Sequence, residues 1–283
     1  MRFKVKMHSF WKELRAVWAI CIKVWKDELS YPLSVTYFIF APVMWLLPFI
    51  IFGFAIVGGR YSPLLEKLTG IGDIVTYTVL GFAFLGFASA ALWGTAMSLR
   101  REQWIGTLES VLVTPVSRFS IIFGQGLHSI THTGSGLVLQ LVAMIIVFGI
   151  HLNLWGLLPS LISVALTILA IQGVGFMICS IVLMVKQGWM VIDVVDTVFW
   201  VVTPTAYPIT ILPAFLQTIA KISPITYGVE SFRGFLLYGP GQMWIWQNIV
   251  ILAVLDIVYL ALGYFIYLKS EEKIKRTGTV HKF

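Results

Sequence analysis

Charged residues are scarce in this chain of 283 residues. Asp, Glu, Lys and Arg make up 12% of it, whereas hydrophobic residues make up 58%. A soluble domain usually carries about 25% charged residues. The composition therefore excludes an ordinary soluble globular protein and indicates an all-α protein surrounded by lipid. Aromatic residues reach 14%, which is typical of membrane proteins with Trp and Tyr belts at both interfaces.

Cysteine and catalytic motifs are also sparse. Cys21 and Cys179 lie far apart in apolar surroundings, so we expect two buried thiols and neither a disulfide framework nor a metal site. No apolar core with a small-residue cleavage site follows the N-terminus, so a cleaved signal peptide is not expected. The sequence contains no GxxxxGK[ST] segment, the loop that binds nucleotide phosphates. We therefore do not expect this chain to hydrolyse ATP by itself or to hold a cofactor.

Long uncharged runs mark the expected membrane spans. The longest, Phe119–Val185, has 67 residues and breaks naturally at residues 151–156, HLNLWG. A spanning helix needs about 20 apolar residues. We therefore predict six transmembrane helices, at residues 33–57, 74–98, 119–149, 157–184, 189–212 and 244–268.

The distribution of Lys and Arg sets the expected orientation, because positive residues stay in the cytoplasm. Sixteen of the twenty fall in residues 1–30, 99–118, the turn at Lys186 and the tail from Lys269; the others are Arg60, Lys67, Lys221 and Arg233. Both termini and segment 99–118 are therefore expected in the cytoplasm. The net charge of +7 then reflects topology, and nucleic acid is not an expected partner. Three regions follow: the N-terminus with an interfacial helix (1–30), a six-helix transmembrane domain (31–268) and a cytoplasmic tail (269–283).

Two further segments have distinct patterns. Residues 10–28 alternate apolar and charged positions at helical spacing, which predicts an amphipathic helix lying in the membrane interface. Residues 213–243 contain short apolar stretches broken at Ser223-Pro224 and Gly239-Pro240, which predicts short re-entrant helices before the last span.

Within the second span, Gly86, Ala90 and Gly94 are four residues apart and predict close packing against another helix.

Segment 100–118, RREQWIGTLESVLVTPVSR, interrupts two apolar runs with charge. Gly106-Thr107 can end one helical turn and begin another, with Thr107 as N-cap and Glu109 near the positive end of the helix dipole. Leu108, Val111 and Leu112 give this helix an apolar face, and Pro115 ends it. The pattern predicts a short cytoplasmic helix that docks a partner; a plain charged loop that fixes topology is the alternative.

REQWIGTLESVLVTPVSR (101–118) and ISPITYGVESFRG (222–234) resemble segments of ATP-binding-cassette type 2 permeases, in particular those of drug, antibiotic and lipo-oligosaccharide exporters. The resemblance covers essentially the whole chain. It implies a plasma-membrane permease that works with two copies of a separate ATPase subunit, which binds ATP and Mg. The helix after the second span would be the coupling helix, contacting that ATPase through Arg101, Glu102, Gly106, Thr107, Leu108 and Glu109. Helix 10–28 would be the connecting helix.

On this interpretation two permease copies, or one copy and a related permease, pair through the first and fifth spans. Both spans contain prolines that break helical hydrogen bonding. Such breaks survive in lipid only where protein or an aqueous cavity satisfies the freed carbonyls. We therefore expect a central path for a hydrophobic or amphipathic drug, lipid or lipid-linked glycan, lined by Tyr37, Trp45, Phe199, Pro204, Tyr207 and Pro208.

Several ionisable residues lie inside the expected spans: His128, His132, Asp193, Asp196 and Asp256. His128 and His132 share a helix face, and we expect them to face protein or an aqueous path rather than a metal. Ionisable groups in spans are candidates for function, although Asp193 and Asp196 could simply pair with Lys186 or an arginine. These residues also permit an alternative function, a proton-coupled secondary transporter, although no internal repeat is visible. A lipid-modifying enzyme would need a polar catalytic cluster that the loops do not offer.

Overall fold

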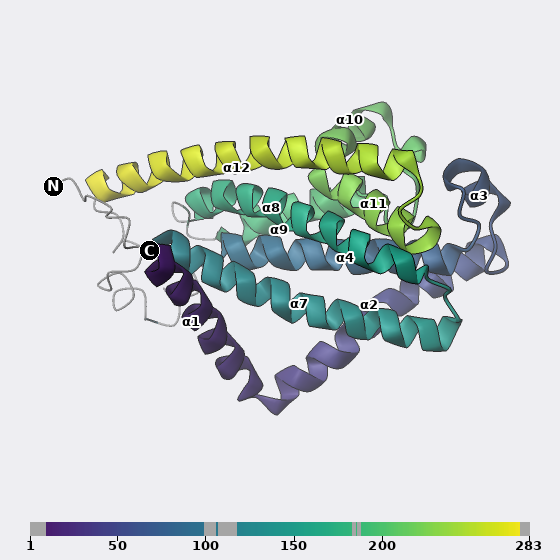
Figure 1. Ribbon diagram of the computed structural model, residues 1–283, viewed down its shortest axis with the longest axis horizontal. Helices are drawn as coiled ribbons and strands as arrows, with labels where there is room; N and C mark the ends of the chain where they lie inside the picture. The colour runs from purple at the N-terminus through teal and green to yellow at the C-terminus, as the bar shows by residue number, and fades with distance from the viewer. Residues whose placement is uncertain (1–9, 99–105, 107–117, 183–184, 186–187, 278–283) are drawn as a thin grey trace.

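The computed structural model describes residues 10–98, 106, 118–182, 185 and 188–277. Their regular structure is helical, with one isolated bridge between Tyr61 and Asp73. By length and composition, four helices of the described part can cross a membrane: α4 (Ile74–Ala96), α7 (Arg118–Phe148), α8 (Leu157–Val182) and α12 (Met243–Thr277). They run side by side along the long axis of the molecule (Figure 1). The prediction of an all-helical membrane protein is therefore confirmed.

The central helix is α4, which packs against α7, α8 and α11 (Pro224–Tyr238). Of its apolar window 78% is buried, compared with 6% for α7 and 22% for α12. Leu80, Phe84 and Leu92 of α4 join Ile171 of α8 and Phe232 of α11 in the largest hydrophobic core. The apolar residues of α7 and α12 instead face outward, as expected for helices that contact lipid.

Most helix bounds agree with the sequence prediction, but the fifth helix does not. α2 (Pro32–Val57) occupies the first expected span, and a short 3-10 helix, η1 (Leu154–Gly156), marks the turn before α8. α9 (Gly188–Val202) stops ten residues before the expected end at 212. Pro204 disfavours helical backbone at the preceding residue and cannot donate a backbone hydrogen bond. From Thr203 the chain therefore leaves the helix, and only a short 3-10 turn, η2 (Ile209–Ile211), follows.

The segment before the last helix folds as predicted into short helices. α10 (Ala214–Ile222) and α11 are separated at Ser223-Pro224, and α11 ends at Gly239-Pro240. α11 is buried among α4, α8 and α12, so it belongs to the bundle and not to a surface loop. The sequence prediction did not include α3 (Pro63–Thr69), a two-turn helix capped by the Ser62 side chain and ended by Gly70.

The N-terminal helix α1 (Phe10–Leu29) is present where an amphipathic helix was expected, but it is docked along α7. The Ser120 hydroxyl, at the start of α7, donates to the Glu13 carboxylate over 2.5 Å. Trp25 Nε1 donates to Thr131 Oγ1 over 3.0 Å, about 16 Å further along α7 at 1.5 Å per residue. These two hydrogen bonds show that α1 runs along α7 from its start towards its middle. α1 and α2 form a V whose apex stands away from the bundle (Figure 1).

The neighbouring helices α8 and α12 approach each other at paired glycines. A Cβ atom added to Gly173 would lie 2.4 Å from the backbone of Tyr259, and one added to Gly263 would lie 2.2 Å from the Gly173 carbonyl oxygen. In α4, the expected close packing holds at Gly94, where a Cβ would lie 1.9 Å from Ser129 Oγ, but not at Gly86, which has nothing within 4 Å.

A Cβ atom has no room at Gly173 but has room at Gly86. Substitution by alanine is therefore predicted to have opposite effects on stability at these two positions. Gly173→Ala should destabilise the protein by about 1–3 kcal/mol, because the backbone of Tyr259 cannot yield to the added methyl group. Gly86→Ala is the matched control and should be neutral or stabilising by up to about 1 kcal/mol, since alanine favours the helix and has room. Thermal unfolding midpoints in detergent measure both. Equal midpoints for the two variants would contradict the close α8–α12 approach.

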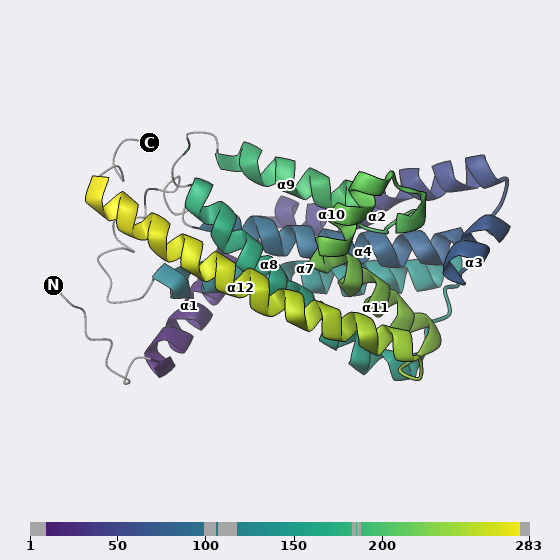
Figure 2. The ribbon, with the colours of Figure 1, turned by 90° about the horizontal axis from the view of Figure 1, so that it is seen from above.

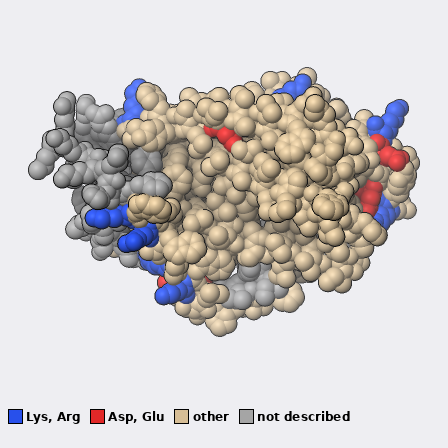
Figure 3. All heavy atoms as spheres, in the orientation of Figure 1, with Lys and Arg blue, Asp and Glu red and all other residues tan. Residues whose placement is uncertain are grey.

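Charged side chains lie towards the two ends of the molecule, and the broad middle of the visible face carries few (Figure 3). At the end occupied by α3, the Arg60 guanidinium donates to both Asp73 oxygens over 2.9 and 2.7 Å and to the Phe148 carbonyl. Asp73 in turn caps α4 through the Val75 amide and accepts from the Thr76 hydroxyl. This cluster ties the ends of α2, α4 and α7 together.

The Arg60–Asp73 pair predicts a pH-dependent stability. Partial burial acts to raise the pKa of the Asp73 carboxyl, but hydrogen bonds from Arg60 and Thr76 and the charge of Arg60 outweigh it and lower the pKa. A lowered folded pKa gives stability that is complete above the unfolded value, about 3.9, and is lost as pH falls through the folded one. Arg60 is 42% exposed, so we expect the Arg60–Asp73 pair to contribute at most about 1 kcal/mol to the free energy of unfolding. Asp73→Asn keeps the cap and should lower the unfolding midpoint equally at pH 7 and 5, with the difference shrinking below about pH 4 and vanishing once the pH is below the lowered folded pKa; a constant difference would contradict this assignment.

Candidate functional site

The polar residues singled out in the spans are gathered around the central helix α4. Asp196 of α9 contacts it from one direction, and His128 and His132 of α7 lie across a cavity from it. Arg233 of α11 contacts it nearer its N-terminal end. Asp196 and Arg233 thus make polar contacts with α4, whereas the two histidines face it across the cavity.

Asp196 is held by two donors of α4. The Ser89 hydroxyl donates to Oδ1 over 2.5 Å and Trp93 Nε1 donates to Oδ2 over 3.0 Å. These bonds satisfy the part-buried carboxylate of Asp196, and no arginine pairs with it in the described part of the chain; the alternative partner Lys186 lies outside the described residues. Asp193, almost one turn earlier, is exposed. Asp196 therefore links α9 to α4, whereas Asp193 does not.

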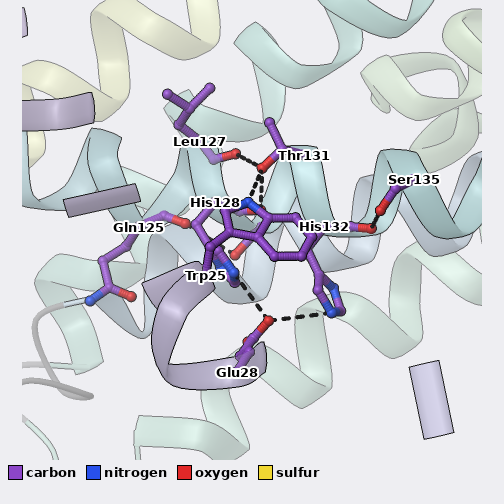
Figure 4. Close-up of polar contacts among 9 residues, drawn as sticks. Trp25, Glu28, Gln125, Leu127, His128, Thr131, His132 and Ser135 are labelled. Carbon is purple, nitrogen blue, oxygen red and sulfur yellow. Dashed lines mark hydrogen bonds and ion pairs between the residues drawn. The ribbon is translucent and has the colours of Figure 1, made fainter. Parts of the chain in front are cut away.

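His128 and His132 face α1, where they meet a carboxylate that the sequence analysis did not single out. The Glu28 Oε2 atom lies 3.1 Å from Nε2 of His128 and 3.4 Å from Nε2 of His132. The Trp25 ring packs against both imidazoles at centroid distances of 5.2 and 5.5 Å. Figure 4 shows these side chains converging from α1 and α7. Both histidines thus lie against side chains of α1, and both also border a cavity.

Arg233, a second residue that the sequence analysis left without a role, joins α11 to the point where α9 ends. It is 4% exposed, and its Nη2 lies 3.0, 2.8 and 3.2 Å from the carbonyl oxygens of Tyr77, Pro204 and Thr205. Its guanidinium also lies 3.6 Å from the centre of the Tyr77 ring. It therefore supplies donors for carbonyls that lost helical partners when α9 stopped.

The close fit at Arg233 depends on a glycine in α4. A Cβ atom at Gly81 would lie 2.5 Å from both Arg233 Nη2 and the Thr205 carbonyl oxygen. Glycine is thus the residue that lets the broken segment pass directly over the central helix. The signal for this arrangement in the sequence was a lone arginine within an apolar stretch, downstream of a Pro-rich break.

The residues expected to line a path are divided between two environments. Pro204 is buried beneath Arg233, and Phe199 is partly buried and packs against the main hydrophobic core. That these two side chains line a path stays a prediction. Tyr207 and Pro208 are partly exposed, and the Tyr207 hydroxyl donates to the Val201 carbonyl over 2.6 Å. Tyr37 and Trp45 belong to α2, but their side chains lie outside the described residues.

Asp256 is the most isolated carboxylate of the described residues. It is 4% exposed on α12, and neither oxygen has a hydrogen-bond partner within the described part of the chain.

The expected coupling residues Arg101, Glu102, Thr107, Leu108 and Glu109 lie outside the described residues. Gly106 is described and has φ of +77° with nothing packed within 4 Å of its Cβ position. That left-handed conformation suits glycine and agrees with the expected turn before Thr107.

Comparisons with known proteins agree with the arrangement of helices. The model of the ABC-2 type transporter family matches residues 16–237. The probable doxorubicin resistance ABC transporter permease DrrC of Mycobacterium tuberculosis is 26% identical over 218 residues, which cover 74% of this chain and 75% of the relative. The inner membrane transport permease YadH of Escherichia coli is 28% identical over 248 residues, 81% of this chain and 85% of the relative. A second Escherichia coli permease, YhhJ, is 24% identical over 181 residues.

Proposed function

Because the chain belongs to the ABC-2 type transporter family and is therefore a multi-pass transmembrane subunit of an ABC transporter, we propose that it exports a hydrophobic or amphipathic molecule. The observation that carries the proposal is the uncovered apolar surface of α2 and α9. Large hydrophobic side chains on both helices are exposed: Phe40, Met44, Phe49, Ile51, Phe52 and Ile56 of α2, and Trp189, Met190, Val194, Val198 and Val201 of α9.

These two helices lie along the same edge of the bundle (Figure 2). An apolar helix face can contact lipid, but α2 and α9 also flank the broken segment 203–212, where Tyr207 and Pro208 are partly exposed. Non-helical backbone at membrane depth is stable only against protein or a water-filled cavity. A second permease copy seated on this edge would enclose the segment and create a path between the two subunits.

The topology we propose has six crossings with both termini in the cytoplasm. α2 has 26 residues, enough to cross, and α9 followed by α10 and α11 forms a broken fifth passage. The start of α1, the ends of α4 and α8 and the end of α12 lie at one end of the molecule (Figure 1). Lys12 and Arg15 near the start of α1 and Lys269, Lys273, Lys275 and Arg276 near the end of α12 belong to these segments, which supports a cytoplasmic position.

Two copies of a separate ATPase subunit would supply the energy, because no phosphate-binding loop is present in this sequence. Segment 101–109 is proposed to form the coupling helix that meets the ATPase. The docking of α1 along α7 offers a second connection, since a displacement of α1 would reach the middle of α7. ATP-driven closure of the ATPase pair would thus shift the permease dimer between inward- and outward-facing states.

Dye accumulation in cells tests this function. Cells that express this chain together with its ATPase partner should accumulate less of a hydrophobic fluorescent dye such as rhodamine 6G than cells that express either protein alone. Collapse of the proton gradient at constant ATP should leave the difference unchanged. Export that follows the proton gradient, and needs no ATPase partner, would contradict the proposal and favour a secondary transporter.

A further inference from the structure

Asp193 differs from the other acidic residue of its helix because it faces away from the bundle. It is the sixth residue of α9, about 7.5 Å of helix from the first one at 1.5 Å per residue. Its side chain is exposed and forms no hydrogen bond or ion pair within the described part of the chain. Asp196 is bound instead by Ser89 and Trp93 of α4. Asp193 is therefore available to a group outside the bundle.

The elements on this edge of the molecule carry no positive charge. α2, α9 and segment 203–212 contain no Lys, Arg or His, and Asp193 and Asp196 are their only acidic residues. Ionisable residues in membrane helices are rare and almost always face a bundle interior or a water-filled cavity. Acidic residues also contribute little to the orientation of a membrane protein. Neither contact with lipid nor a role in topology therefore accounts for the position of Asp193.

Asp193 belongs to a stripe of exposed side chains on α9. Trp189, Asp193 and Thr197 are four residues apart, so they are neighbours on one helix face, with about 5–6 Å between successive Cβ atoms. Trp189 is 44% exposed, and an indole ring attracts cations. The Thr197 hydroxyl can accept a hydrogen bond. The exposed apolar side chains of Met190 and Val194 lie beside the stripe, which thus offers a carboxylate, an aromatic ring and a hydroxyl oxygen on an apolar surface.

A second copy seated on this edge would bring a second carboxylate to the same path. A dimer of identical copies is two-fold symmetric, so both subunits present the same patch. Two carboxylates enclosed in an apolar interface without a cation would be unfavourable. An organic cation between the copies removes that cost, because it offers a positive charge to Asp193 and an apolar body to the neighbouring side chains. A carboxylate beside an aromatic ring is suited to an organic ammonium group.

We propose that Asp193 and Trp189 recognise an organic ammonium ion, a protonated amine or quaternary ammonium group on an apolar or aromatic body. The proposal rests on the proposed function, because the ligand reaches Asp193 along the path between two copies. It narrows the transported molecule to one that carries an ammonium group. Asp193 contacts the charge, and the exposed apolar side chains of α2 and α9 contact the body, so the residue determines specificity.

Binding of a charged probe and its carbon isostere tests this assignment. Radiolabelled (1-naphthylmethyl)trimethylammonium and 1-neopentylnaphthalene, which has carbon in place of the charged nitrogen, would be titrated against the permease–ATPase complex without ATP. Dodecyl maltoside, an uncharged detergent, keeps the complex in solution, and binding to empty micelles is subtracted. Asp193→Asn should weaken binding of the cation roughly tenfold, through loss of one partly screened charge interaction, and leave the isostere unchanged. Trp189→Leu should weaken the cation roughly threefold.

Two variants and a lipid serve as controls. Asp193→Glu keeps the charge and should retain most of the affinity for the cation. Asp27→Asn removes an exposed carboxyl group from α1, which packs along α7, and should bind both probes like the wild type. Phosphatidylcholine, added as a competitor, distinguishes two sources of the ammonium group. Displacement of the cation would support a lipid headgroup as the ligand, and no displacement would support a soluble ammonium compound.

The outcomes separate this proposal from the proposed function. Equal affinity of the wild type and Asp193→Asn for the cation would overturn the role of Asp193. Equal losses for both probes, together with a lowered unfolding midpoint, would also overturn it, because Asp193 would then act on the fold. ATP-driven export of neutral dyes could persist in either case. Conversely, cation binding that depends on Asp193 in a complex without ATP-driven export would support the site and contradict the exporter.

Discussion

Replacement of Arg233 with methionine is expected to remove most of the folded permease from the membrane. The substitution keeps an unbranched side chain similar to the apolar stem of arginine but leaves the Pro204 and Thr205 carbonyls without their donor, and these carbonyls lie where water does not reach them. Each unsatisfied buried polar group costs about 1–3 kcal/mol, so the loss amounts to about 2–6 kcal/mol. Detergent-extracted monodisperse protein, measured by size-exclusion chromatography, should fall roughly tenfold.

The control for Arg233 is Lys221→Met, which removes an exposed cation from the neighbouring helix α10. It should leave the yield unchanged. Arg233→Lys should give an intermediate yield, because lysine keeps the charge but lacks the planar fork that can lie over Tyr77 and contact several carbonyls at once. A normal yield for Arg233→Met would show that the break after α9 does not depend on this arginine.

Substitution of the coupling segment is expected to uncouple ATP hydrolysis from transport. The double variant Leu108→Ala with Glu109→Ala should still insert and bind the ATPase weakly, but transport should fall by about tenfold or more while ATP hydrolysis continues. The reason is that the apolar face and the N-terminal charge of the expected helix would no longer fit the partner. Rates of ATP hydrolysis and dye transport in the same proteoliposomes give the ratio directly.

Ser110→Ala provides a matched control for the coupling segment. At 100° per residue, position 110 lies on the opposite side of the expected helix from Leu108 and Leu112. This variant should keep the wild-type ratio of transport to hydrolysis. Unchanged transport in the double variant, or equal losses in the double variant and in Ser110→Ala, would contradict the assigned coupling role.

The sequence was sufficient to predict long helices because uncharged runs and flanking charges are local signals. α4 and α7 occur within two residues of the expected bounds. It also predicted the division of 213–243 into short helices, since Ser223-Pro224 and Gly239-Pro240 act on the backbone directly. The early end of α9 was missed because an apolar run from 203 to 212 satisfies hydropathy, while the prolines and the distant Arg233 decide its conformation.

The site was harder to predict because its contacts join residues that are distant in the sequence. His128 and His132 can be recognised in the sequence as a pair on one helix face. Glu28 is about 100 positions away, and nothing in the sequence distinguishes it from the other charged residues of an amphipathic helix. Asp196 was recognised as unusual, although Ser89 and Trp93 could be identified as its partners only from the packing of α9 on α4. Pro204 and Phe199 are expected on a path because they lie in a broken span, but only the structure shows that Pro204 is buried and that Phe199 packs against the core.

The central claim, that ATP consumed by a partner moves this permease, can be measured without knowledge of the substrate. A spin label at Val57, which is 40% exposed near the end of α2, in a variant with Cys21 and Cys179 replaced by alanine, reports the distance between two permease copies. Electron paramagnetic resonance on the permease–ATPase complex should give one distance distribution without nucleotide and a shifted one with ATP and vanadate, whereas acidification alone should leave it unchanged. A distance distribution that does not change with ATP but shifts with pH would contradict an ATP-driven permease and favour a proton-driven carrier.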